Sequence, residues 1–193
     1  MCGRYQFTLE QCAEILEIAR EVERRHGAGA WRPGEVRPTA KAPVLVSDEE
    51  GIHPQLLTWG YRLPGSLVIN ARAETAAEKN LFRDSVASRR CVVPSTGFFE
   101  WDGEKRKYLF TLPGEPALYM AGLYMMREGQ PCYCVLTTAA NDSMKEVHPR
   151  MPLVLRREQV SSWLEQPGET MAFLHITPPT LEKVSVDAQM RLW

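Results

Sequence analysis

A succession of short strand-like runs in the middle of the chain constrains the fold more than any other feature. These runs are rich in β-branched and aromatic residues, and turn-forming stretches such as residues 102–104 and 127–129 separate them. They cover residues 91–94, 97–101, 107–112, 117–125 and 131–138, and three more precede them at 44–47, 56–59 and 67–70. Many short strands with few helices predict an α+β fold, with a bent antiparallel sheet or barrel-like core and a few flanking helices.

Helical patterns are few. Thr8 and Gln11 form a capping box before apolar residues at helical spacing, which predicts a helix that ends near Gly27. Residues 27–43 hold several Gly and Pro and predict a loop. Further helices are expected at residues 74–88, 141–147 and 158–164.

The composition is that of one ordinary globular domain, here residues 1–193. No apolar run approaches the length of a membrane span, and the start lacks a signal-peptide layout, so we expect a cytoplasmic protein. Neither the five cysteines nor the four histidines show zinc-site spacing, so no metal and no cofactor are expected. With a net charge of −1, any nucleic-acid site must be a local patch.

Cys2 follows the initiator methionine, and removal of Met1 would give it a free α-amine beside its thiol. The amine has a reference pKa of about 7.7–8.0 and the thiol one of about 8.5, so both nucleophiles are partly available at neutral pH. An aldehyde can form an imine with the amine and then be captured by sulfur as a five-membered thiazolidine. The alternative is a chance Met-Cys start without function.

Two further residues lie in unusual contexts. Glu100 is a carboxylate inside the aromatic run Gly97-Phe98-Phe99-Glu100-Trp101, where it is paired, exposed at a rim, or active in acid–base chemistry. His148 precedes Pro149 in a stiff, non-helical context and is either a proton donor near pH 7 or a structural residue.

Six segments together resemble the SRAP family, the SOS response-associated peptidases. Four carry most polar residues of interest: Met1-Cys2-Gly3-Arg4, Ile69-Asn70-Ala71-Arg72 with the following Glu74-Thr75-Ala76, the Glu100 run, and His148-Pro149-Arg150-Met151-Pro152. Thr58-Trp59-Gly60-Tyr61 and Thr137-Thr138-Ala139-Ala140 also match. The resemblance is clearest over residues 1–155, and the tail after Leu181 is shortened relative to the family.

The resemblance implies a sensor that crosslinks to abasic sites in single-stranded DNA through a thiazolidine on the processed Cys2. Asn70 would hold the N-terminal residue, Glu100 would shuttle protons, and His148 would favour the ring-opened sugar and support strand cleavage. Associated lyase activity, reversal of the crosslink and self-removal of residues before Cys2 are implied as well. The family further suggests a bacterial monomer of the DNA-damage response that associates with the nucleoid and meets replication-fork proteins.

The same resemblance implies a set of DNA contacts. The phosphate-binding cations would be Arg4, Arg72 and Arg150, and Trp59 would stack on a base. Pro38 would line the same channel, and Thr138 would touch a phosphate. The alternatives are a core position for Trp59 and a solvated surface for the arginines.

Two other functions remain open. An N-terminal-nucleophile amidohydrolase would also use Cys2, with its amine as base, and would pass through a thioester. A non-catalytic single-strand binder would treat abasic and intact strands alike.

Overall fold

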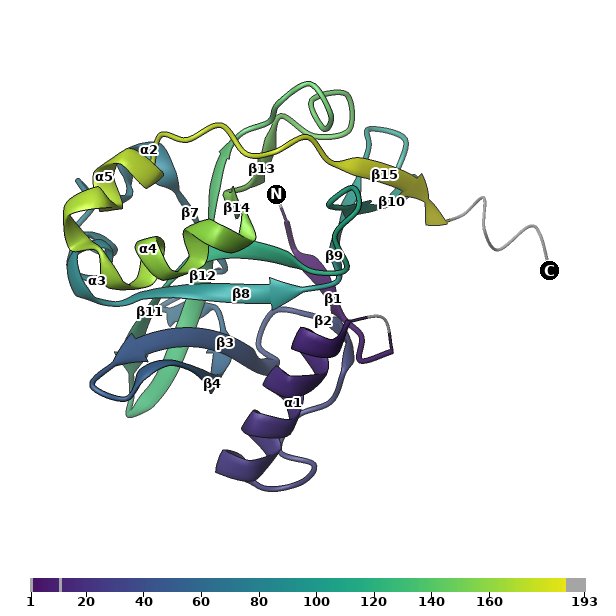
Figure 1. The fold of residues 1–193 in the computed structure, drawn as a ribbon. Helices are drawn as coiled ribbons and strands as arrows, with labels where there is room; N and C mark the ends of the chain where they lie inside the picture. Colours follow the sequence, from purple (N-terminus) through teal and green to yellow (C-terminus); the bar gives the residue numbers. More distant parts are fainter. Residues whose placement is uncertain (1, 11, 187–193) are drawn as a thin grey trace.

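Five strands close into a barrel in the computed structural model, which describes residues 2–10 and 12–186 (Figure 1). Each strand pairs with two neighbours, in the cyclic order β12–β4–β3–β8–β11 and back to β12. The strands are β3 (Lys41–Asp48), β4 (Gly51–Trp59), β8 (Arg90–Ser95), β11 (Leu118–Arg127) and β12 (Gln130–Ala139). The predicted α+β fold with a barrel-like core is confirmed.

The strands pair antiparallel except at β12. This strand runs parallel to β4 and to β7 (Asn70–Arg72), and antiparallel to β11 and β13 (Arg150–Pro152). Parallel pairing requires a long connection, and the chain between β4 and β12 provides it. The strand β14 (Val154–Leu155) pairs with the start of β11, on the edge opposite β8.

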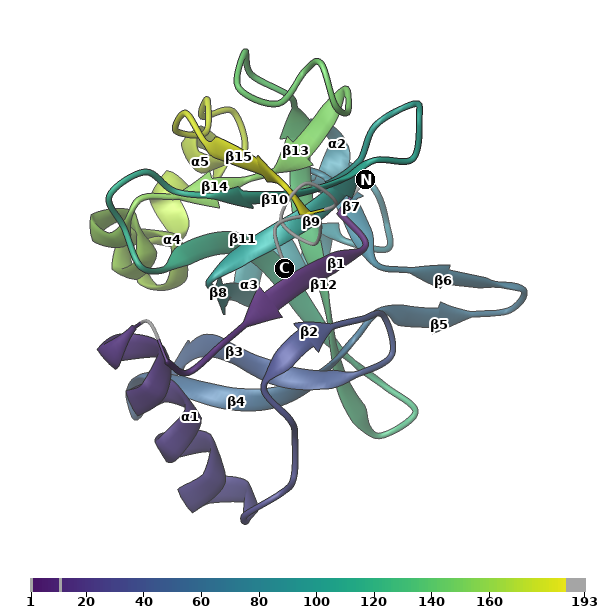
Figure 2. The same ribbon diagram turned by 90° about the vertical axis from the view of Figure 1, so that its right-hand side faces the viewer.

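A second sheet lies beside the barrel, in the order β15–β10–β9–β1–β2 (Figure 2). Its strands are β1 (Arg4–Phe7), β2 (Gly34–Val36), β9 (Gly97–Trp101), β10 (Lys107–Thr111) and β15 (Glu182–Ser185), all antiparallel. The chain passes from the barrel into this sheet between β8 and β9. Gly97 lies at that corner, where a Cβ would come within 2.7 Å of the Phe110 carbonyl oxygen.

The first helix, α1 (Ala13–His26), packs against β3 and β4 through Ile15, Ile18, Ala19 and Val22. It begins later than predicted, with Cys12 rather than Thr8 as the N-cap. The Thr8 hydroxyl instead lies 2.9 Å from the Thr96 hydroxyl, at the end of β1. Gln11, the other half of the predicted capping box, lies outside the described residues.

The helix predicted over residues 74–88 is two short helices, α2 (Ala73–Ala76) and α3 (Arg83–Ser88), separated by turns. The one predicted over 141–147 is absent, and turns take its place. There the Asn141 carboxamide oxygen accepts the Ser143 N–H at 3.0 Å, a local bond that competes with helix formation. The predicted loop 27–43 contains β2 and the start of β3.

The C-terminal helical region follows the prediction more closely. A 3₁₀ turn (Arg157–Gln159) leads into α4 (Val160–Glu165), a second turn (Pro167–Glu169) follows, and α5 (Thr170–Phe173) ends it. These helices pack beside β8 and α3 (Figure 1). The remaining strands, β5 (Tyr61–Leu63) and β6 (Ser66–Val68), form a hairpin that projects from the barrel (Figure 2). Within residues 2–10 and 12–186, no helix is long and apolar enough to cross a membrane.

Candidate functional site

Two strands from different sheets bring Cys2 and Asn70 together. Cys2 directly precedes the β1 region of the second sheet, and Asn70 opens β7, whose pairing with β12 places it opposite Val135. The Asn70 side-chain amide donates a hydrogen bond to the Cys2 carbonyl oxygen at 3.0 Å. Asn70 Oδ1 is buried and has no hydrogen-bond partner in the part of the chain that the structure describes. The Asn70 amide nitrogen therefore anchors the N-terminal segment, and the amide oxygen is available to accept a further hydrogen bond.

Glu100 and His148 face each other next to this pair. Glu100 is only 3% exposed, and its Oε1 lies 3.6 Å from His148 Nε2. The Arg150 backbone holds the other ring nitrogen, because both its N–H and its carbonyl oxygen lie 3.0 Å from His148 Nδ1. These contacts orient the ring so that Nε2 lies toward Glu100. Of the alternatives for Glu100, the exposed rim position is therefore wrong, because the carboxylate is buried and paired.

The Cys2 thiol is fully buried. Desolvation by this burial, and then the negative charge of Glu100, raise its pKa well above the ordinary value for a thiol. Its only described hydrogen bond, within residues 2–10 and 12–186, is a long one of 3.7 Å to the Arg4 carbonyl oxygen. Burial and the nearby carboxylate charge therefore both favour the neutral thiol over the thiolate.

The three predicted DNA-binding arginines have different surroundings. Arg72 is exposed. Arg4 is partly exposed, lies over the Trp101 ring and pairs with Glu35 at 3.3 Å. The Arg150 guanidinium is already paired, because it donates hydrogen bonds to both Glu74 carboxylate oxygens, at 2.6 and 2.9 Å.

Trp59, predicted to stack on a base, has no exposed face in the structure. Trp59 is fully buried, and its ring stacks on Tyr133 with centroids 6.2 Å apart. Its indole N–H donates to the Ile69 carbonyl oxygen at 3.0 Å. The alternative, a core aromatic residue at the end of a strand, is the position that the structure shows.

The two remaining predicted contacts are only partly accessible. Pro38 is half-buried in a turn after β2. Thr138 is 9% exposed, and its hydroxyl donates to Glu74 at 3.4 Å. Neither side chain is free to reach far from the fold.

A family model described as SOS response associated peptidase (SRAP) matches residues 1–190. The chain belongs to the SRAP family. Among its relatives, abasic site processing protein YoaM of Bacillus subtilis is 30% identical over 191 residues, covering 90% of this chain and 83% of YoaM. Abasic site processing protein YedK of Escherichia coli is 28% identical over 180 residues, covering 86% and 80%.

Solved structures share the SRAP chain's fold. A crystal structure of a protein from Bacteroides thetaiotaomicron aligns with a TM-score of 0.75 at 23% identity, covering 96% of this chain and 92% of that one. Another, from Bordetella bronchiseptica, aligns with a TM-score of 0.74 at 24% identity, covering 96% and 99%. At these identities the likeness concerns the fold alone.

Sequence reasoning missed two carboxylates of this SRAP site. Glu74 holds Arg150, and the hydrogen bond from Arg150 is the main reason why the pKa of Glu74 falls to about 2. Glu35 binds cations from three directions, among them Arg37 and Lys107. Glu74 stands inside a family-like segment, which was a usable signal, whereas nothing in the sequence around Glu35 marks it.

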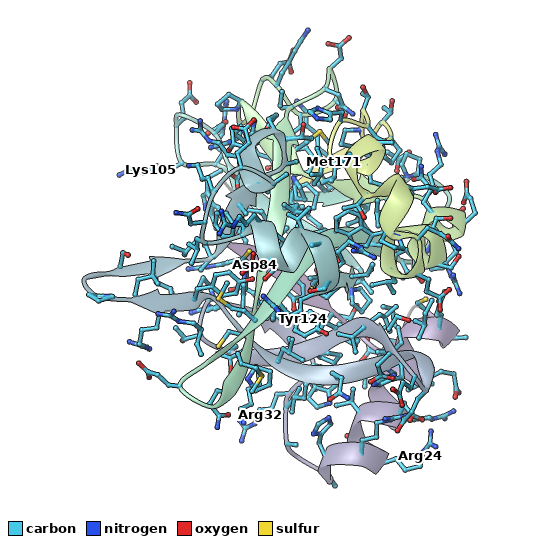
Figure 3. All side chains as sticks on the ribbon, turned by 90° about the vertical axis from the view of Figure 1, so that its left-hand side faces the viewer. Arg24, Arg32, Asp84, Lys105, Tyr124 and Met171 are labelled. Carbon is cyan, nitrogen blue, oxygen red and sulfur yellow. The ribbon has the colours of Figure 1, made fainter. Side chains whose placement is uncertain are left out.

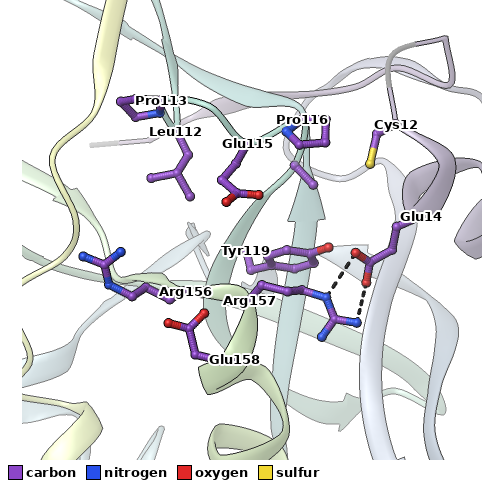
Figure 4. Close-up of a pocket in the computed structure, with 11 residues that line it drawn as sticks. Cys12, Glu14, Leu112, Pro113, Glu115, Pro116, Tyr119, Arg156, Arg157 and Glu158 are labelled. Atoms are coloured by element: carbon purple, nitrogen blue, oxygen red, sulfur yellow. Dashed lines mark hydrogen bonds and ion pairs between the residues drawn. The ribbon is translucent and has the colours of Figure 1, made fainter.

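Another cavity of the SRAP chain lies away from this site (Figure 4). Its volume is about 150 Å³, and Tyr119 forms part of its wall. There Arg157 reaches Glu14 on α1 with a nitrogen–oxygen distance of 2.9 Å. It is not lined by Cys2, Asn70, Glu100 or His148. Within residues 2–10 and 12–186, no group of three or more His, Cys, Asp or Glu side chains could hold a metal ion.

Proposed function

We propose that this protein captures abasic sites in single-stranded DNA through a thiazolidine on Cys2. The observation that carries the proposal is the convergence of Asn70, Glu100 and His148 on the N-terminal cysteine. This chain covers 83% of YoaM and 80% of YedK, and both relatives are named abasic site processing proteins. An abasic site in its ring-opened form carries an aldehyde at C1′, which is the electrophile that an aminothiol requires.

The first step is the removal of Met1, which frees the α-amine of Cys2. We propose that the protein itself can assist this removal. The amine attacks C1′, and loss of water gives an imine. The unpartnered Oδ1 of Asn70 supports this step, because it is a buried acceptor on the side chain that already binds the Cys2 carbonyl. A free amine is the donor that such an acceptor requires.

Ring closure follows when the Cys2 sulfur attacks the imine carbon. The S–H proton must leave as the C–S bond forms, and the imine nitrogen must gain one. Because burial and Glu100 raise the pKa of the thiol, a pre-formed thiolate is disfavoured. Glu100 therefore carries the proton from sulfur to nitrogen as general base and then general acid. The sum is one aldehyde and one aminothiol giving a thiazolidine and one water.

His148 accounts for the proposed lyase activity. Its Nε2 faces Glu100 at 3.6 Å, which allows a proton to move between the two groups with a small displacement. From the imine, removal of a C2′ proton breaks the C3′–oxygen bond, and the 3′ phosphate leaves by β-elimination. The same acid–base pair can reopen the thiazolidine, which gives reversal.

Strand binding rests on Arg72 in the conformation described, and on Arg4 and Arg150 once a phosphate displaces their carboxylate partners, Glu35 and Glu74. We further propose that the protein acts as a monomer, in the cytoplasm, on damaged chromosomal DNA. An arginine–phosphate contact of this kind is independent of base sequence.

The test is a denaturing gel with the protein, its Met1 removal checked by mass spectrometry, and a single strand that carries one abasic site. We expect a heat-stable adduct with wild type and with the control Cys12→Ala, and none with Cys2→Ala. An undiminished heat-stable adduct from Cys2→Ala would contradict the mechanism. With an amide substrate, a hydroxylamine-labile thioester between the substrate's acyl group and Cys2 would instead favour an N-terminal-nucleophile amidohydrolase.

A further inference from the structure

Three cations converge on Glu35 on one face of the second sheet. Glu35 binds Arg37 and Lys107 at 2.8 Å each and Arg4 at 3.3 Å. They come from β1, from the residue after β2, and from β10. One carboxylate is therefore shared by three cations among the described residues.

The cluster adjoins the site around Cys2 through the strand register. Arg4 pairs with Phe99, and Lys107 pairs with Trp101, so both cations lie one strand position away from Glu100, on the opposite face of the sheet from its side chain. Arg4 is also two residues from Cys2, about 7 Å along an extended chain. A strand held at Cys2 would thus place a neighbouring phosphate within reach of these cations.

Aromatic rings fix the two inner cations in place. Lys107 Nζ lies 3.8 Å from the Phe99 ring centroid and 5.5 Å from that of Trp101. The Arg4 guanidinium lies 5.2 Å from the same Trp101 ring. Cation–π contacts of this kind hold charged groups at a partly dry surface without neutralising them.

Glu35 remains charged at this position. Partial burial raises its pKa, but hydrogen bonds from Lys107 and Arg37 and the charge of Arg4 outweigh this effect and lower it. A carboxylate among cations occupies the same kind of position as a phosphate oxygen. Any strand that binds here must exchange these ion pairs for its own.

We propose that Arg4, Arg37 and Lys107 form a phosphodiester-binding site for the strand beside the captured lesion, and that Glu35 is an internal competitor for it. The inference rests on the proposed function and adds two cations and one regulatory carboxylate to it. Binding of a strand displaces Glu35, and its return to the cations favours release.

The test is the salt dependence of binding to an intact single strand, measured by fluorescence anisotropy. We expect Glu35→Gln to tighten binding several-fold, because the amide carries no charge to compete with phosphate. Arg37→Ala and Lys107→Ala should each weaken binding and reduce the slope of log K against log salt by about 0.7. Arg24→Ala is the matched control, because Arg24, labelled in Figure 3, pairs with Glu21 on α1.

The yield of adduct at saturating protein tests the proposed function separately from this inference. All three variants should reach the wild-type yield of adduct on the abasic strand. If wild type forms the adduct but the slopes of Arg37→Ala and Lys107→Ala equal that of wild type, the inference is overturned and the proposed function stands. If wild type neither binds nor forms an adduct, both are overturned. Arg37 is 64% exposed, so its replacement leaves the core intact.

Discussion

The task of Glu100 is set by the two groups it lies between. On one side its charge helps to keep the Cys2 sulfur protonated, and on the other it faces the imidazole of His148. A carboxylate in this position can serve as a proton carrier without touching the phosphate backbone. Its contribution to rate and its contribution to affinity should therefore separate in experiment.

Replacing Glu100 with Gln should slow formation of the adduct by about 10²-fold, because the amide cannot accept the thiol proton. Affinity for an intact single strand should stay near that of wild type. Single-turnover gel kinetics and anisotropy measure the two quantities. A collapse of affinity in Glu100→Gln would assign the residue a structural role instead.

At the scale of elements, one ion pair ties α2 to β13. Arg150 binds the Glu74 carboxylate with two nitrogens and donates to the Thr137 carbonyl oxygen at 2.6 Å. The Arg150 backbone also holds His148, so the same residue orients the imidazole. The pair thus connects packing of the strand ends with the geometry of the site.

This pair predicts a pH dependence of stability. The pKa of Glu74 falls from 4.5 to about 2, so its stabilising effect is complete above pH 4.5 and is lost as the pH drops toward 2. Because the carboxylate is 37% exposed, we expect the effect to be only about 0.5–1 kcal/mol. Urea unfolding of wild type and Glu74→Gln should differ most above pH 4.5 and converge toward pH 2. A constant difference across that range would contradict the assignment.

A second element-scale prediction concerns Arg90, which is buried at the start of β8. Its guanidinium donates to four backbone carbonyls near the ends of α3 and α4, those of Val86, Ala87, Trp163 and Leu164. Arg90→Leu would leave these acceptors unpaired and should lower the free energy of unfolding by about 3 kcal/mol or more. The control Arg83→Leu, at a position 59% exposed on α3, should change it by less than about 0.5 kcal/mol. Equal losses in the two variants would argue against the carbonyl contacts.

The sequence predicts strands better than it predicts their ends or the helices. Alternation and turn residues identify β8 to β12, because these signals are local. The predicted helix at residues 141–147 fails because Asn141 bonds to its own neighbours and to the Pro178 carbonyl, a partner 37 residues away. Such a contact exists only after the chain has folded.

The site, like the fold, could be predicted from the sequence only in part. Cys2, Asn70, Glu100 and His148 stand in recognisable segments, and the structure brings them together. Strand alternation predicts that Trp59 and its neighbours point to opposite faces of the sheet. It does not predict which of the two faces other parts of the protein cover. The cluster around Glu35 needs the four strands β10, β9, β1 and β2 in register, so sequence alone could not predict it.

At the scale of the whole molecule, closure of the barrel joins segments that are far apart in the chain. Thr58 of β4 pairs with Cys132 of β12, and the Tyr5 and Tyr133 hydroxyls lie 2.7 Å apart across 128 positions. Because long loops must close before such contacts form, we expect folding on a timescale of about milliseconds to seconds. Stopped-flow refolding followed by tryptophan fluorescence measures this. Folding within microseconds would contradict the dependence on long-range pairing.

The burial of every described cysteine has a practical consequence for labelling. Cys2, Cys12, Cys91, Cys132 and Cys134 are all free thiols inside the fold. Ser66, in contrast, is exposed at the tip of the projecting β5–β6 hairpin. A maleimide dye should therefore react with Ser66→Cys well before it reaches Cys12, Cys91, Cys132 or Cys134. A single fluorophore placed there would let individual molecules be watched as they arrive on a DNA strand and leave it.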